Sequence, residues 1–161
     1  MTYRTAEDQI VTTPALAKKL TGPMSLCGLR TGVTTGSVEL AYMKKLSHQC
    51  VVAHKRPITI GIYQDIGSVF LAVVSGHIDY TSNAAELTPS AMKQYPNKLA
   101  GSFLVKGLSF TVGVGVAKNK PLLGHAVTAA MHALQVAGIE KELLKKWGYP
   151  ASTQMAAKYV A

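Results

Sequence analysis

Residues 32–39 carry the residue types with the clearest capacity for ligand chemistry. An apolar run ends there in small and hydroxyl side chains, and the stretch that follows has helical spacing. A strand that opens a helix in this way presents unpaired backbone N–H groups at the positive end of the helix dipole, which favours a carboxylate or phosphate. The hydroxyl groups that would add further donors belong to Thr34, Thr35 and Ser37.

A plainer interpretation of the same segment stays open. Gly36 or Ser37 would also serve as an ordinary helix cap, with Glu39 in the first turn. The segment lacks the Gly-Lys-Ser/Thr ending of a phosphate-binding P-loop. An anion-binding loop and an inert cap are therefore both compatible with these residues.

Catalytic constellations are sparse elsewhere in the chain. The five histidines are scattered, and no aspartate accompanies a serine or cysteine nucleophile motif. No metal-ligand spacing and no cofactor motif is present, and Glu86 with His77 is the only nearby acid–base pair. The sequence predicts a binding protein with no catalytic residue, no metal and no cofactor.

Strand and helix patterns alternate, which is typical of a parallel or mixed sheet covered by helices. We expect strands at residues 9–12, 29–34, 58–62, 77–81 and 108–117. Helices are expected at residues 38–46, 68–74, 121–136 and 139–147, with a loop and helix over 82–94. The tail from Pro150 onward gives no clear signal.

Length and composition indicate one globular domain. The 161 residues are 48% hydrophobic and 16% charged, and no apolar run approaches the length of a membrane span. The net charge of +9 comes from dispersed lysines and arginines, which favours a solvated surface over a nucleic-acid interface. The first residues lack the pattern of a signal peptide, so a native chain of this length would stay in the cytoplasm, whereas a piece of a precursor would carry no such information.

The two cysteines, Cys27 and Cys50, have no neighbouring CxxC or Cys/His cluster. Two buried thiols are expected in a cytosolic protein, and one disulfide is expected in an exported one. The residues alone do not decide between these states.

Four segments, taken in order, resemble the second lobe and C-terminal end of the amino-acid-type (family 3) solute-binding proteins of ABC transporters. The first is the strand–loop–helix with Gly-Val-Thr-Thr-Gly-Ser, and the second is Ser-Gly-His-Ile-Asp-Tyr. The third is Val-Gly-Val-Gly-Val-Ala-Lys, and the last is an Ala-Val…Leu…Lys-Trp-Gly helical pair. They occupy residues 26–38, 75–80, 112–120 and 123–148.

This resemblance implies a truncated periplasmic-binding-protein-like (type II) α/β lobe that works as half of a clamp on an amino acid and is read by a transporter permease. It implies ligand contacts from Thr34, Thr35, Gly36, Ser37, Val38 and Asn83. It also implies a Cys27–Cys50 disulfide and an extracytoplasmic (periplasmic or cell-surface) parent protein, with no nucleic-acid partner.

The chain departs from the family pattern in two ways. Ala84 stands where the family usually has an aspartate for the ligand's ammonium group, and Val38 replaces a usual hydroxyl. Most of the first lobe has no counterpart. We therefore expect residues 1–12 and 110–120 to be hinge strands, 13–109 the second lobe, and 121–161 helices that normally pack on the first lobe.

The exposed apolar face of those helices would be covered by a second copy in a homodimer or by a complementing first lobe. The function expected from the resemblance is solute binding for an ABC transporter, with a polar amino acid or a similar anionic or zwitterionic solute as ligand. The alternatives are a self-associating half-protein that acts as an interaction module, and a dehydratase-like enzyme on the same fold.

Overall fold

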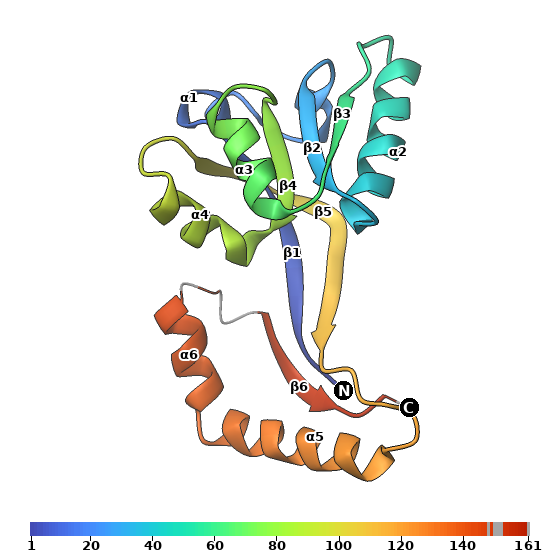
Figure 1. The fold of residues 1–161 in the computed structure, drawn as a ribbon, viewed down its shortest axis with the longest axis vertical. Helices are drawn as coiled ribbons and strands as arrows, with labels where there is room; N and C mark the ends of the chain where they lie inside the picture. The colour runs from blue at the N-terminus through green and yellow to red at the C-terminus, as the bar shows by residue number, and fades with distance from the viewer. Residues whose placement is uncertain (148, 150–152, 161) are drawn as a thin grey trace. The chain divides into compact units, whose positions relative to one another are not determined.

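The computed structural model describes residues 1–147, 149 and 153–160. They form two compact units: the first contains Met1–Ala6 and Ser109–Ala161, and the second contains Glu7–Leu108. Strands β1 (Thr2–Thr12) and β5 (Ala100–Gly113) each contribute residues to both units (Figure 1).

The second unit is built on a mixed sheet, as the alternating pattern predicts. Strands β2 (Arg30–Thr34), β3 (Thr59–Tyr63) and β4 (Tyr80–Ala84) join β1 and β5 in the order β3-β2-β4-β1-β5. β2 runs parallel to both β3 and β4, whereas β1 runs antiparallel to β4. The α/β fold class expected from the sequence is confirmed.

Helices cover both faces of this sheet. The chain leaves β2 through α2 (Val38–Val52) to reach β3, and then returns through α3 (Ile66–Val74) to β4 on the other side of β2. Since parallel crossovers are right-handed, the reversal places α2 and α3 on opposite faces. Neighbouring residues of β1 pack in different hydrophobic clusters, one with each helix. Ile10 packs in the cluster with Met43 of α2, and Val11 packs in the cluster with Val69 of α3.

Shorter elements complete the second unit. They are α1 (Pro14–Ala17), the 3₁₀ turns η1 (Pro23–Leu26) and η2 (Ala85–Leu87), and α4 (Thr88–Gln94). A disulfide joins Cys27, directly after η1, to Cys50 of α2. Its sequence separation of 23 residues corresponds to a stabilisation of about 3 kcal/mol on the loop-closure estimate.

Strand β4 begins three residues later than the pattern of residues 77–81 predicts. The reason is the end of α3, where Gly76 adopts a left-handed φ of +74°. The N–H groups of His77 and Ile78 then both donate to the carbonyl of Ala72 and close the helix. Residues 77 and 78 therefore belong to the end of α3, and the strand starts after them.

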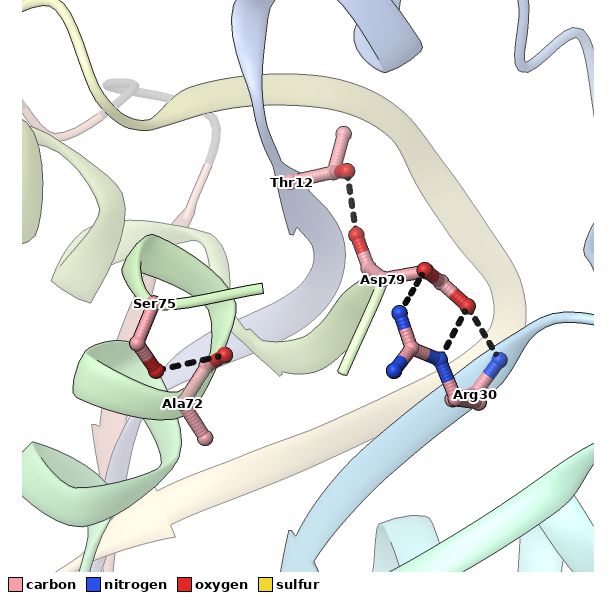
Figure 2. A network of polar contacts seen from close by, with 5 residues as sticks. All are labelled: Thr12, Arg30, Ala72, Ser75 and Asp79. Atoms are coloured by element: carbon pink, nitrogen blue, oxygen red, sulfur yellow. Dashed lines mark hydrogen bonds and ion pairs between the residues drawn. The ribbon is translucent and has the colours of Figure 1, made fainter. Parts of the chain in front are cut away.

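An ion pair fixes where β2 and β4 begin (Figure 2). Asp79 Oδ2 accepts from the backbone N–H of Arg30 at 2.7 Å and from its Nε at 3.1 Å, while Nη2 of Arg30 donates to Oδ1 at 2.7 Å. The N–H of Asp79 donates to the carbonyl of Arg30 at 2.8 Å, and Thr12 Oγ1 donates to the carbonyl of Asp79 at 2.6 Å. The amino ends of β2 and β4 and the carboxyl end of β1 are therefore tied at one residue.

The first unit contains α5 (Pro121–Val136), α6 (Ile139–Trp147) and β6 (Gln154–Lys158), which pairs with the start of β1. Gln135 of α5 holds β6 in place. Its Nε2 donates to the carbonyl of Met155 at 2.8 Å, and its Oε1 accepts from the N–H of Ala157 at 3.0 Å. The two helices match their predicted bounds, whereas β6 gave no signal in the sequence.

Two further strands are longer than the pattern indicates. β1 begins at Thr2 instead of Gln9, and β5 covers Ala100–Gly113 instead of residues 108–117. The first residues of β1 are mostly polar, so their extended form follows from pairing with β6 and not from alternation of apolar side chains.

Taken one at a time, the helices of the described residues are too short or too polar to cross a bilayer. Only α5 and α6 together reach the required length and hydropathy, and they are bent by 76° at the break between them.

The substitution Asp79→Ala should lower the free energy of unfolding by about 1 kcal/mol, because it removes the acceptor of three hydrogen bonds from Arg30 in a pair that is exposed to solvent. Hydrogen bonds from Arg30 lower the pKa of Asp79, so this stabilisation is present at neutral pH and is lost as the pH falls through the lowered pKa. Urea denaturation at pH 7 measures the loss.

The control for this prediction is Glu7→Ala, which removes an exposed carboxylate from the same unit. Equal stability of the two variants at pH 7 would show that the ion pair does not fix the strand ends.

Candidate functional site

The carboxyl ends of β2 and β4 define the place where this fold can bind a ligand. The two strands are parallel and hydrogen-bonded, so Thr34 and Ala84 end at the same edge of the sheet. The chain reverses its direction of travel across the sheet at β2, and the crevice outside such a point is where open α/β sheets bind ligands. The loop expected to bind an anion leads directly from this edge into α2.

The loop opens the helix without capping it. Gly36 has a φ of +72°, which allows the reversal between strand and helix, and Ser37 occupies the N-cap position with extended backbone. Ser37 Oγ makes no capping hydrogen bond, and this buried atom has no partner among the described residues. Ser37 is therefore the N-cap residue by position, but its side chain does not cap the first turn of α2.

The other predicted loop residues lie at the surface. Thr35, Gly36 and Val38 are exposed, and Thr34 is half-buried. The N–H of Thr35 donates to the carbonyl of Tyr63 at 3.2 Å, so the loop is fixed to the end of β3. The loop thus has a defined backbone and an open helix N-terminus, which is the arrangement that receives an anionic group.

A buried acid, Asp8, lies at the same edge. It is opposite Ala84 in the pairing of β1 with β4 and is 0% exposed. Ser82 Oγ donates to its Oδ2 at 2.8 Å, whereas its Oδ1 has no partner among the described residues. Burial raises the pKa of Asp8 to about 6; the Ser82 hydrogen bond opposes this shift, and Glu39 and Glu86 add to it.

Sequence reasoning missed Asp8 because strand β1 was expected to begin at residue 9. A strand extended by one residue would have placed Asp8 on the same face as the buried Ile10, two positions away. An acid on the apolar face of a strand is the signal that could have identified it.

Asn83, the remaining predicted ligand residue, lies on the opposite face of β4 from Ser82. It is paired with Gln9 across the strands, and its Nδ2 donates to Thr81 Oγ1 at 2.9 Å. That hydroxyl in turn donates to the carbonyl of Gly32 at 2.8 Å, so the amide takes part in a hydrogen-bond chain within the sheet. Its role in ligand binding stays a prediction.

The acid–base pair considered for an enzyme does not assemble. His77 precedes β4 and Glu86 follows it, so the whole strand lies between them, a separation of about 13 Å or more at 3.3 Å per residue. His77 instead shares a 2.7 Å hydrogen bond with Ser75. Among the described residues, no group of three acidic, histidine or cysteine side chains is placed to hold a metal ion.

No protein-family model and no curated protein sequence matches this chain. Solved structures do. The amino-acid ABC transporter substrate-binding protein AbpA of Streptococcus pneumoniae, bound to L-arginine, has a TM-score of 0.77 at 16% identity, over 91% of this chain and 59% of its own.

The chain has a periplasmic-binding-protein-like fold. A structure described for glutathione import via GshT and the cystine ABC importer TcyBC of Streptococcus mutans gives a TM-score of 0.78 at 15% identity, over 99% of this chain and 67% of that one. The ancestral amino-acid-binding protein AncCDT-1, a precursor of cyclohexadienyl dehydratase, gives 0.70 at 19% identity, over 89% and 58%. The chain thus spans about three fifths of the length of AbpA and of AncCDT-1.

The substitution Asp8→Asn should stabilise the free protein at pH 8 by on the order of 1–2 kcal/mol. Because folding raises the pKa of Asp8 from 3.8 to about 6, the penalty for ionising it builds up between these values and is complete above about pH 6. An uncharged amide costs less to bury than a carboxylate. The advantage of the variant should shrink as the pH falls from 8 to 5, where the native carboxyl is protonated. Thermal unfolding across this pH range measures it, and a variant less stable than the native chain at pH 8 would contradict the argument.

Proposed function

We propose that this chain is the second lobe of a solute-binding component of an ABC transporter and binds an amino-acid-like solute at the carboxyl edge of β2 and β4. The observation that carries the proposal is the open N-terminus of α2, which lies at this edge in a fold shared with amino-acid-binding proteins. Its N–H groups and the unpartnered Ser37 Oγ are suited to the carboxylate of an amino acid.

The contacts proposed for the ligand are those of the loop and of the end of β4. They comprise Thr34, Thr35, Gly36, Ser37, Val38 and Asn83. Strands β1 and β5 would be the hinge strands, because each contributes to both compact units. Closure on the ligand would be read by a transporter permease, and the parent protein would work outside the cytoplasm.

A panel of the twenty amino acids, titrated by calorimetry and by thermal shift, tests this function. We expect binding of at least one amino acid, because the loop supplies donors for a carboxylate. Ser37→Ala should weaken that binding roughly ten- to hundredfold, which corresponds to the loss of one hydrogen bond to a charged group. No response of the native chain at millimolar ligand would contradict the proposal.

The matched control is Ser90→Ala, which removes an exposed hydroxyl from α4 in the same unit. It should leave the affinity unchanged. Since Ser37 Oγ is buried without a partner, Ser37→Ala should also leave the stability of the free protein unchanged or raise it slightly, which separates loss of binding from loss of fold.

The first unit supports a second proposal, that its helices pack on a complementing first lobe. Several large apolar side chains there face solvent, and Leu122, Val136 and Trp147 are 83%, 76% and 65% exposed. The binding-protein structures that resemble this chain contain a further segment with no counterpart in it. A lobe of that kind would cover these side chains.

Charge favours such a lobe over a second copy of this chain. The first unit is strongly basic, with Arg4, Lys118, Lys120, Lys141, Lys145, Lys146 and Lys158 against Glu140 and Glu142. Two copies would repel each other, whereas an acidic lobe would be attracted. A pocket of about 240 Å³ beside α5 and α6 could receive an apolar side chain of that lobe, with the buried Glu140 in its wall.

In the isolated chain the uncovered helices should bind a hydrophobic dye and associate non-specifically as concentration rises. The double substitution Leu122→Glu and Val136→Glu should abolish both effects, and His132→Glu with Lys141→Glu, at exposed polar positions, is the control. Sedimentation analysis measures association. A dye-free monomer would show that no interface is present, and a defined dimer at micromolar concentration would favour a second copy instead.

A further inference from the structure

The buried carboxyl of Asp8 has an incomplete environment. The residue is 0% exposed, one of its oxygens accepts from Ser82, and the other has no partner among the described residues. A buried carboxylate without a full set of donors is costly, because it has left water without compensation. This observation is independent of the helix N-terminus described above.

The surroundings of Asp8 are acidic in a chain that is basic as a whole. The protein carries 17 basic and eight acidic residues, yet Glu39 in the first turn of α2 and Glu86 in η2 both act on Asp8. Three of the eight acids thus gather at the carboxyl edge of the sheet. No metal ion fits there, since no group of three such residues in the described part of the chain is placed to ligate one.

Strand pairing directs Asp8 toward this edge. It is opposite Ala84, the last residue of β4, and Ser82 lies on the same face two residues earlier. Ala84 itself has no carboxylate, so the carboxylate beside the end of β4 is that of Asp8 on β1. β1 pairs with β4, and β4 pairs with β2, whose carboxyl end leads into the loop that opens α2.

We infer that Asp8 receives a cationic group, ammonium or guanidinium, of the ligand that the loop holds by its carboxylate. The inference rests on the proposed function and adds to it the residue that receives the positive charge of the amino-acid-like ligand. A ligand cation supplies the missing partner of Oδ1 and offsets the repulsion among the three acids.

Binding of this kind depends on pH. The pKa of Asp8 is about 6 in the free protein, chiefly through burial, and a bound cation stabilises the ionised form. The affinity should be constant above pH 7 and fall below pH 6, by up to about tenfold per pH unit, because the carboxyl must first lose its proton. The groups that act on Asp8 are Ser82 from β4, Glu39 from α2 and Glu86 from η2.

The test compares the full native chain with Asp8→Asn, using L-arginine, L-citrulline, 5-guanidinopentanoate and agmatine as probes. L-Citrulline lacks the guanidinium, 5-guanidinopentanoate lacks the α-ammonium, and agmatine lacks the carboxylate. Asp8→Asn should weaken L-arginine binding about tenfold or more and remove the fall in affinity below pH 6. L-Citrulline and 5-guanidinopentanoate identify which cation Asp8 receives. Asp8→Asn should weaken the binding of L-citrulline if Asp8 receives the α-ammonium, and the binding of 5-guanidinopentanoate if it receives the guanidinium.

The matched control is Glu7→Gln, which neutralises the adjacent exposed carboxylate and should leave affinity and its pH dependence unchanged. Asp8→Asn is expected to fold, since it removes a buried charge. Equal affinity of Asp8→Asn and the native chain for L-arginine would overturn the inference and leave the proposed function intact. Failure of the native chain to bind any amino acid would overturn the proposed function and the inference with it.

Discussion

The ion pair between Arg30 and Asp79 is the constraint on which the site depends. It joins the amino ends of β2 and β4 through side chains and backbone together, and Thr12 attaches the end of β1 to the same residue. Because each residue of a strand advances a fixed distance, registration at one end decides which residues meet at the other. Asp8 lies opposite Ala84 at the carboxyl end of β4 only because Thr12 lies opposite Tyr80 at its amino end.

The same register decides which residues face each other across the sheet. Successive strand residues point to opposite faces, so Ser82 and Asn83 serve different surroundings although they are neighbours in sequence. Ser82 donates to the buried acid, and Asn83 donates to Thr81 within the sheet. A slip of one residue would exchange the two and remove the Ser82 hydrogen bond from Asp8, which is why a fixed register at the other end of these short strands matters for the site.

The parts of the fold that could be predicted from the sequence are those governed by local pattern. Helices α5 and α6 follow from apolar spacing and from Gly138, and the loop before α2 follows from its small and hydroxyl residues. The parts that could not be predicted depend on partners distant in sequence. Strand β6 is held by β1 and Gln135, and the hydrogen bond of Asp8 comes from Ser82 of β4, so neither leaves a periodic signal of its own.

The candidate site has opposite charge at two points of one edge of the sheet, and this would orient a ligand that carries both charges. The open N-terminus of α2 carries partial positive charge, and the carboxyl of Asp8 carries negative charge in acidic surroundings. The first point follows the end of β2 and the second lies within β1, and these strands are separated by β4 and hence by two strand spacings, about 10 Å. A simple anion satisfies only the first point and leaves the buried acid uncompensated. A solute that carries both a carboxylate and a cation, as proposed above, would satisfy both points, and it would compensate the three acids that this basic chain keeps at one edge of its sheet.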